Sequence, residues 1–277
     1  MQSKKKLVNT NEPIFFDRSQ EYLEHIEQQI NSITSERSGF IDLSSLELIE
    51  IPEILREVEN KFWIDLSSNS LSVIPDWFYN LDNILFVNLS RNNFSQLPIR
   101  LLHMKSIIKI DFSYNDLGKL QPWKFDNSNL EILILENCRL KKFPRFIKGL
   151  KNLVNLSIKN NYIRKVPDWV NELTNIKTLN CENNYLRNIP LIKSLNDLEC
   201  FNLKSNKISD ITDDLTKCQN LEQLGLSFNN IKEYPKELNK LGKLRRLELE
   251  GNELKIIPEF VKDLKKLEVL NISNNEI

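Results

Sequence analysis

The 277-residue sequence is poor in the residues that enzymes most often use to bind phosphate, hold metals or transfer protons. Its six glycines form no glycine-rich phosphate loop, and its two histidines, His25 and His103, lie far apart in the chain. No histidine, cysteine and carboxylate residues share the spacing of metal ligands, and no nucleophile has an evident partner base. We therefore expect no catalytic residue, no metal site and no cofactor.

The sequence also lacks an excess of charge of either sign, because 38 Lys and Arg residues balance 38 Asp and Glu residues. This balance argues against nucleic acid or an anionic membrane as the partner. No segment approaches the roughly 18 consecutive apolar residues of a membrane span, and the basic residues 4–6 precede no apolar run of a signal peptide. The four cysteines stand singly, which is typical of a reducing compartment, so we expect a cytoplasmic protein.

What the sequence does contain is an asparagine that recurs every 23 residues, with one step of 22 and one of 46 across Cys138. Each asparagine occupies the same place in a frame, Leu-x-x-Leu-x-Leu-x-x-Asn-x-Leu-x-x-Ile-Pro, which residues 84–98 illustrate. The frame asparagines are Asn69, Asn92, Asn115, Asn161, Asn184, Asn206, Asn229, Asn252 and Asn275. Self-similarity with this period predicts a stacked solenoid, because no single unit can bury its apolar face alone.

One repeat, residues 61–83, shows how the frame predicts local structure. Ile64 and Leu66 alternate with polar or aromatic neighbours, which indicates a short strand with these two side chains turned into the core. Trp63 and Asp65 then face away from the core. The same pattern predicts one strand in every repeat.

The second half of the frame predicts a turn and a short helix. Asn69 follows the strand, and we expect its side-chain amide to pair with backbone groups that the bend leaves unsatisfied. Pro75 has a fixed φ and no N–H group, which suits the first turn of a short helix on the opposite, convex side. The frame predicts eleven such repeats over residues 39–277, the last one truncated.

This frame resembles the leucine-rich repeat family, in its cytoplasmic type with repeats of about 23 residues. The resemblance implies an α/β solenoid, or horseshoe, with a parallel concave β-sheet and short convex helices or turns. Residues 38–52 also resemble the first repeat of bacterial and Roco-type proteins, in which the repeats precede a Ras-like GTPase or another signalling domain. In the family the concave face is the usual docking surface.

The N-terminal segment departs from the frame. Residues 1–16 are expected to form a flexible leader, and residues 17–38 a capping helix, centred on 18–34, that covers the first repeat. Asp17 and Gln20 resemble a capping box. Four apolar residues share one face of this helix: Leu23, Ile26, Ile30 and Ile33. The alternative is a free amphipathic helix for a partner or a membrane.

The sequence stops at Ile277, within a repeat, and no polar capping helix follows. We interpret the chain as a piece of a longer protein. Its last strand then offers an open edge, so the chain is expected to be a monomer or to self-associate weakly through that edge.

Side chains at outward positions on the concave face do not pack in the core, so the choice of residues there can indicate a binding site. In the N-terminal half these positions are rich in aromatic residues flanked by aspartates, as is common at interfaces. The candidate partner-binding residues are Phe40, Asp42, Trp63, Asp65, Phe86, Asp111, Tyr114, Ile132, Ile134, Lys159, Tyr162 and Tyr185. The alternative is that Phe40 and Trp63 pack under the N-terminal helix.

The sequence therefore predicts a non-catalytic, intracellular protein–protein interaction module that binds a protein partner on its concave face. A second hypothesis is that the repeats are the sensing or targeting region of a longer signalling enzyme. That enzyme would be a Roco-like GTPase or a bacterial effector, with its catalytic domain outside this chain.

Overall fold

The computed structural model describes residues 39–57, 62–118, 128–211, 213–257 and 259–277. The leader expected over residues 1–16 and the capping helix expected over residues 17–38 lie outside these described residues.

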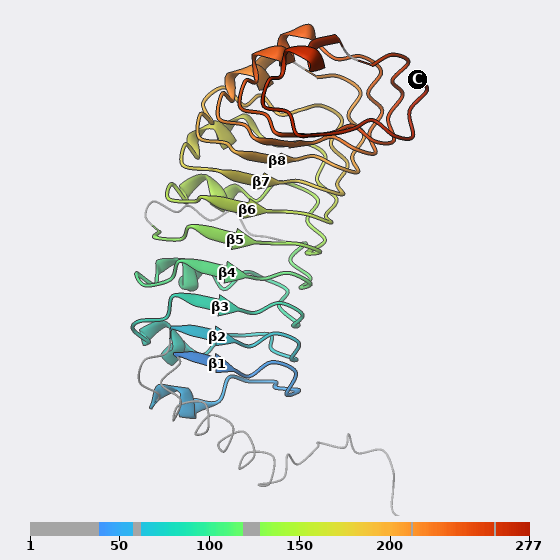
Figure 1. Cartoon of the computed structure of the whole chain (residues 1–277). Helices are drawn as coiled ribbons and strands as arrows, with labels where there is room; N and C mark the ends of the chain where they lie inside the picture. Colours follow the sequence, from blue (N-terminus) through green and yellow to red (C-terminus); the bar gives the residue numbers. More distant parts are fainter. Residues whose placement is uncertain (1–38, 58–61, 119–127, 212, 258) are drawn as a thin grey trace, which may run out of the picture.

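The described chain forms a single parallel sheet of eleven strands that lie in sequence order, stacked one above the next (Figure 1). The strands are β1 (Phe40–Asp42), β2 (Trp63–Asp65), β3 (Phe86–Asn88), β4 (Lys109–Asp111), β5 (Ile132–Ile134), β6 (Asn155–Ser157), β7 (Thr178–Asn180), β8 (Cys200–Asn202), β9 (Gln223–Gly225), β10 (Arg246–Glu248) and β11 (Val269–Asn271). The register joins equivalent positions of successive repeats, such as Ile41 with Ile64. The predicted solenoid with one short strand in each repeat is confirmed.

The convex side carries short 3-10 helices, one turn long, in place of longer α-helices (Figure 1). They are η1 (Glu53–Arg56), η2 (Asp76–Asn80), η3 (Ile99–His103), η4 (Arg145–Gly149), η5 (Asp168–Glu172), η6 (Asp213–Lys217), η7 (Lys236–Lys240) and η8 (Glu259–Asp263). As predicted, a proline such as Pro75 immediately precedes the helix. The N–H of Phe78 donates to the carbonyl oxygen of Pro75 at 3.0 Å, which closes the i to i+3 turn.

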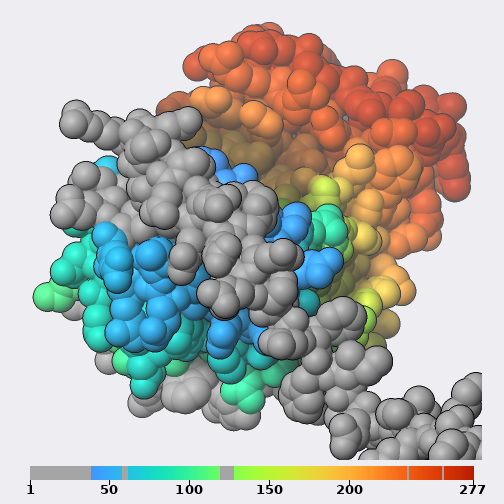
Figure 2. All heavy atoms as spheres, turned by 90° about the horizontal axis from the view of Figure 1, so that it is seen from below, coloured from blue at the N-terminus to red at the C-terminus, as the bar shows by residue number. Residues whose placement is uncertain are grey.

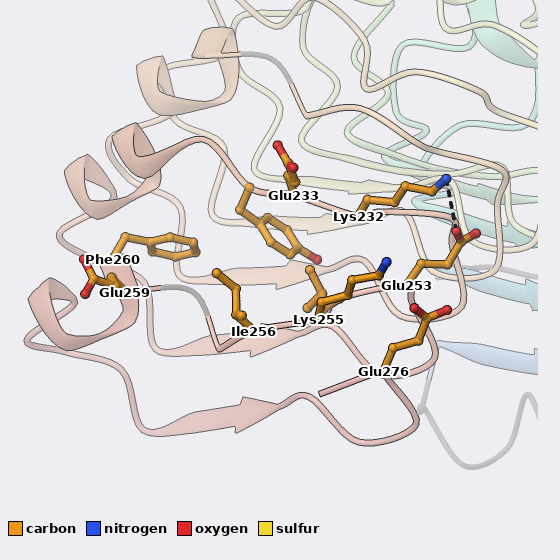
Figure 3. A pocket seen from close by; sticks show the side chains of 10 residues that line it. Lys232, Glu233, Glu253, Lys255, Ile256, Glu259, Phe260 and Glu276 are labelled. Atoms are coloured by element: carbon orange, nitrogen blue, oxygen red, sulfur yellow. Dashed lines mark ion pairs between the residues drawn. The ribbon is translucent and has the colours of Figure 1, made fainter.

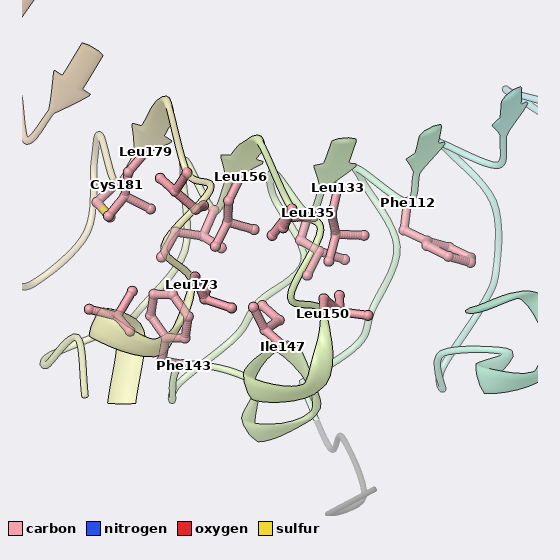
Figure 4. Packing of buried hydrophobic residues seen from close by; sticks show 14 of the residues in the cluster. Phe112, Leu133, Leu135, Phe143, Ile147, Leu150, Leu156, Leu173, Leu179 and Cys181 are labelled. Carbon is pink, nitrogen blue, oxygen red and sulfur yellow. The ribbon is translucent and has the colours of Figure 1, made fainter. Parts of the chain in front are cut away.

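The core lies between the sheet and the convex turns (Figure 4). Leu133 enters it from β5 and Leu135 from the position just after that strand, and Phe143 and Ile147 enter it from the opposite side. All four side chains are buried. Burial of a side chain of this size contributes about 1.5–3 kcal/mol, so each repeat is stabilised by its neighbours and not by itself.

The frame asparagines form the predicted polar ladder inside the bend. The amide nitrogen of Asn92 donates to the carbonyl oxygens of Leu66 and Leu89 at 2.9 and 3.1 Å. Its Oδ1 accepts the N–H of Leu71 at 2.9 Å. Each asparagine thereby pairs backbone groups of its own repeat and of the preceding one, as the sequence predicted.

Cys138 replaces the asparagine in one repeat and reproduces only part of this bonding. Its thiol lies 3.3 Å from the carbonyl oxygen of Phe112 and 3.4 Å from that of Glu136, where an asparagine would donate its amide. It has no oxygen acceptor in its side chain, so the N–H of Leu117 donates to the backbone carbonyl of Cys138 at 3.1 Å.

The solenoid curves along its length. Seen from below, the last repeats, coloured orange to red, arch to one side of the first repeats, coloured blue to cyan (Figure 2). None of the helices in the described ranges combines the length and the apolar character that a membrane crossing needs.

Candidate partner-binding surface

The structure brings three of the predicted aromatic residues together on the outer side of the sheet. Phe40, Trp63 and Phe86 are paired in register at the start of β1, β2 and β3. The ring centroids of Phe40 and Trp63 are 5.3 Å apart, and those of Trp63 and Phe86 are 5.5 Å apart, both edge to face. Trp63 is 42% exposed and Phe40 38% exposed. We call these three residues the aromatic ladder.

The aromatic ladder ends at β4, where a lysine takes the equivalent position. Lys109 pairs in register with Phe86, and its Nζ lies 5.8 Å from the ring centroid of Trp63. Ile132 and Ile134 follow on β5, half-buried, beyond this lysine. The ladder and the isoleucines are therefore separate patches with a cation between them.

The predicted aspartates run beside the ladder, but each also has a structural task. Asp42, Asp65 and Asp111 each accept the N–H of the residue two positions later, at 2.8–2.9 Å, so that the carboxylate closes the turn at the strand end. The other carboxylate oxygen of Asp65 accepts the side-chain amide of Asn88 at 3.0 Å. These carboxylates already accept hydrogen bonds within the protein, so only part of their acceptor capacity is available to a partner.

Tyr114 and Lys159 lie apart from the ladder. The guanidinium carbon of Arg91 lies 4.0 Å from the ring centroid of Tyr114, so this cation lies over one face of the ring. Tyr114 has a φ of 59°. The corresponding residue of the other repeats also has a positive φ, so the frame itself imposes this left-handed turn. Lys159 forms an ion pair with Glu182 at 3.1 Å, which neutralises both charges.

The last two predicted residues, Tyr162 and Tyr185, stack on each other. Their ring centroids are 6.0 Å apart with an interplanar angle of 22°, and both side chains are exposed. They line a groove of about 1100 Å³ with five basic residues. We call these five the basic flank: Lys141, Lys142, Arg164, Arg187 and Lys207.

The basic flank was not among the candidate residues that the sequence predicted. A signal for them was present. The third residue after the frame asparagine is Arg164 in one repeat and Arg187 in the next, and Lys141 holds the same place after Cys138.

A second cavity, of about 630 Å³, lies against the last repeats (Figure 3). Its wall includes Ile256, Phe260 and the ion pair of Lys232 with Glu253 at 3.5 Å. Ile256 is exposed, and so is Ile257, whereas the residue equivalent to Ile257 in an earlier repeat, Ile74, is buried. The wall of this cavity therefore combines an apolar side chain that the last repeats leave exposed with charged groups such as Glu233, Lys255 and Glu276.

The cysteines do not form a reactive site. Cys200 is half-buried, and burial raises its pKa. A raised pKa keeps the thiol protonated at neutral pH, and the protonated form is a poor nucleophile. Within the described ranges, no group of three or more His, Cys, Asp or Glu side chains could hold a metal ion.

Comparison with solved structures shows the fold. A leucine-rich repeat protein from Leptospira interrogans is 20% identical with a TM-score of 0.59, and the match covers 90% of this chain and 93% of that one. The Toll–Spätzle complex of Drosophila gives 21% identity and a TM-score of 0.73 over 84% of this chain, but over 34% of the matched chain. A complex of TLR13 with ssRNA13 gives 23% identity and a TM-score of 0.74. That match covers 89% of this chain and 38% of the matched chain.

No curated protein sequence is significantly similar to the chain. The sequence model of the Leucine Rich Repeat family matches residues 63–81, which contain β2, Asn69 and the whole of η2. The matched frame recurs along the described chain, and the sheet has one strand for each recurrence. The chain therefore has the leucine-rich repeat fold, and the repeat that contains β2 matches the family model directly.

Proposed function

We propose that this chain is a non-catalytic interaction module that binds a protein partner on its concave face, chiefly through Phe40, Trp63 and Phe86. The leucine-rich repeat fold generally mediates protein–protein interaction, and one solved relative, Toll, forms a complex with Spätzle. The observation that carries the proposal is the aromatic ladder itself. It places large, partly exposed apolar rings in edge-to-face contact on the side of the sheet opposite the core.

The chemistry of the ladder suits a protein partner. Aromatic rings bury much apolar area with little loss of side-chain freedom, and such residues dominate binding energy at interfaces. Lys109 at one end and Asp65 beside the rings supply charges that can set the orientation of the partner. Ile132 and Ile134 extend the apolar surface beyond Lys109.

The proposal places the protein in the cytoplasm. Cys138, Cys181 and Cys218 are buried as free thiols, and Cys200 is free as well. A protein that folds with single buried thiols is suited to a reducing compartment.

The test is an affinity capture from the cytosol of the source cell, with the partner identified by mass spectrometry. The baits are the parent chain, the Trp63→Ala/Phe86→Ala variant, and an Ile49→Ala/Val73→Ala variant as a matched control. Ile49 and Val73 are exposed apolar residues outside the strands. We expect a protein that the parent and the control retain and that the ladder variant loses, at least about tenfold, which equals about 1.4 kcal/mol of binding free energy.

Circular dichroism at the temperature of the capture shows that each bait is folded. A partner retained equally by all three baits would show that the ladder is structural and would remove the proposed interface. Loss of the partner from the control as well would show that the losses do not report on the concave face.

A further inference from the structure

The basic flank arises from positions that the repeat frame aligns. Lys141, Arg164 and Arg187 occupy one frame position in three consecutive repeats, and neighbouring repeats are about 4.8 Å apart at the strands. Backbone hydrogen bonds hold these turns together just beyond the strands. The N–H of Tyr162 donates to the carbonyl oxygen of Leu140, and that of Tyr185 to Ile163, both at 2.8 Å.

The cations of the basic flank have no carboxylate partner within the part of the chain that the structure describes. Among the residues that the structure describes, none of these five cations forms an ion pair, whereas nearby cations do. Arg139 pairs with Asp116 at 2.9 Å, and Lys159 pairs with Glu182 at 3.1 Å. Five like charges beside one groove repel one another, so an anion that enters the groove gains attraction and relieves this repulsion.

The groove also offers a flat apolar surface among these charges. Tyr162 and Tyr185 stack nearly parallel and are 47% and 40% exposed. The Nζ of Lys207 lies 5.1 Å from the ring centroid of Tyr185. Rings beside cations suit an anionic side chain with an aliphatic stem, because the stem can lie on the ring while the carboxylate reaches the cation.

The extent of the flank favours a short anionic segment over a long polyanion. The flank spans three repeat steps, roughly 14 Å, which an extended peptide covers in about four residues. Glu136 lies on the adjacent part of the concave face, and Asp210 lies in the next repeat after Arg187. A nucleic acid strand that continued past the groove would meet these carboxylates.

We propose that the basic flank, with the Tyr162–Tyr185 pair, is a second docking surface that binds an acidic peptide segment of a protein partner. It lies several repeats away from the aromatic ladder, which takes apolar side chains. The inference rests on the proposed function only in treating the chain as a protein-binding module. Its test requires neither the ladder nor the partner.

The experiment measures the fluorescence anisotropy of a labelled oligoglutamate peptide titrated with the full chain. The variants are Arg164→Glu/Arg187→Glu, Tyr162→Ala/Tyr185→Ala, and Lys105→Glu/Lys266→Glu as a control of equal net charge. Lys105 and Lys266 are exposed and lie outside the groove. We expect the parent to bind, the control to match it, and the arginine variant to lose about tenfold or more in affinity. The tyrosine variant should weaken binding without changing its salt dependence, since it removes no charge.

Three results would overturn the inference: no binding by the parent, an equal loss in the control, or an oligouridylate of matched charge that binds as tightly as the peptide. The last result would assign the groove to nucleic acid. The Trp63→Ala/Phe86→Ala variant should bind oligoglutamate as the parent does. Failure of the ladder proposal and failure of this one are therefore distinguishable.

Discussion

Asn161 donates a hydrogen bond from its side-chain amide to the carbonyl oxygen of Leu135, 26 residues earlier, at 2.8 Å. The same amide nitrogen donates to the carbonyl oxygens of Ile158 and Lys159, and Oδ1 accepts the N–H groups of Cys138 and Leu140. One buried side chain thus satisfies five backbone groups of two repeats, which explains why the frame requires an amide and not merely a polar residue.

Replacing Asn161 should lower the stability of the folded protein. The Asn161→Ala variant leaves buried carbonyl and N–H groups unpaired, so we expect a loss of at least about 3 kcal/mol in the free energy of unfolding. Urea denaturation measures it. Asn239→Ala, at an exposed position in η7, is the control and should change stability by less than about 0.5 kcal/mol. Similar losses for both variants would contradict the role of the asparagine ladder.

Restoring the frame at Cys138 should stabilise the protein. Sulfur is a weak hydrogen-bond donor and acceptor, and the amide of Cys138→Asn can reach the carbonyl oxygens of Phe112 and Glu136 and accept the N–H of Leu117. We expect a gain of about 1 kcal/mol, measured by urea denaturation beside Cys138→Ala, which should lose stability. A destabilised Cys138→Asn variant would show that the local backbone has adapted to the thiol.

Stability should fall in alkaline solution because of the buried thiols. Burial raises the pKa of Cys138 to about 12 and that of Cys218 to about 11, from a usual 9.0, and raises the pKa of Cys181 as well. Folded-state pKa values above the unfolded ones mean that this stability is fully present below about pH 9 and is lost as the pH rises through 11–12.

At pH 10 each buried thiol should lower the free energy of unfolding by about 1 kcal/mol relative to pH 7. The measurement is urea denaturation at the two pH values, for the parent and for a Cys138→Ala/Cys218→Ala variant. The variant starts from a lower stability but should lose less on going to pH 10. An identical pH dependence for both proteins would show that other groups govern the alkaline transition.

The aromatic ladder should contribute modestly to stability even without a partner. Trp63 contacts Phe40 and Phe86 edge to face, and such pairs contribute about 0.5–1.5 kcal/mol each. A double-mutant cycle of Trp63→Ala and Phe86→Ala should therefore give a coupling free energy in this range. A coupling near zero would mean that the rings do not hold one another in solution, and the surface offered to a partner would be less ordered than the structure shows.

The sequence by itself determined the fold, the strand positions and the core of this protein. A repeated frame favours a single fold, because Leu133, Asn161 and Pro75 have the same physical role as their equivalents in most of the other repeats. The 3-10 character of the convex turns did not follow from the pattern, since a proline start and a few apolar residues suit either helix type.

Only part of the candidate surface could be predicted from the sequence. The frame places Trp63 next to Phe86, so the aromatic ladder could be foreseen. Only the tertiary structure decided how exposed side chains meet: Asp65 closes its own turn, Arg91 covers Tyr114, and Lys159 is neutralised by Glu182. The physical reason is that core positions are fixed by burial in every repeat, whereas outward side chains are placed by the particular charges and rings of the adjacent repeats.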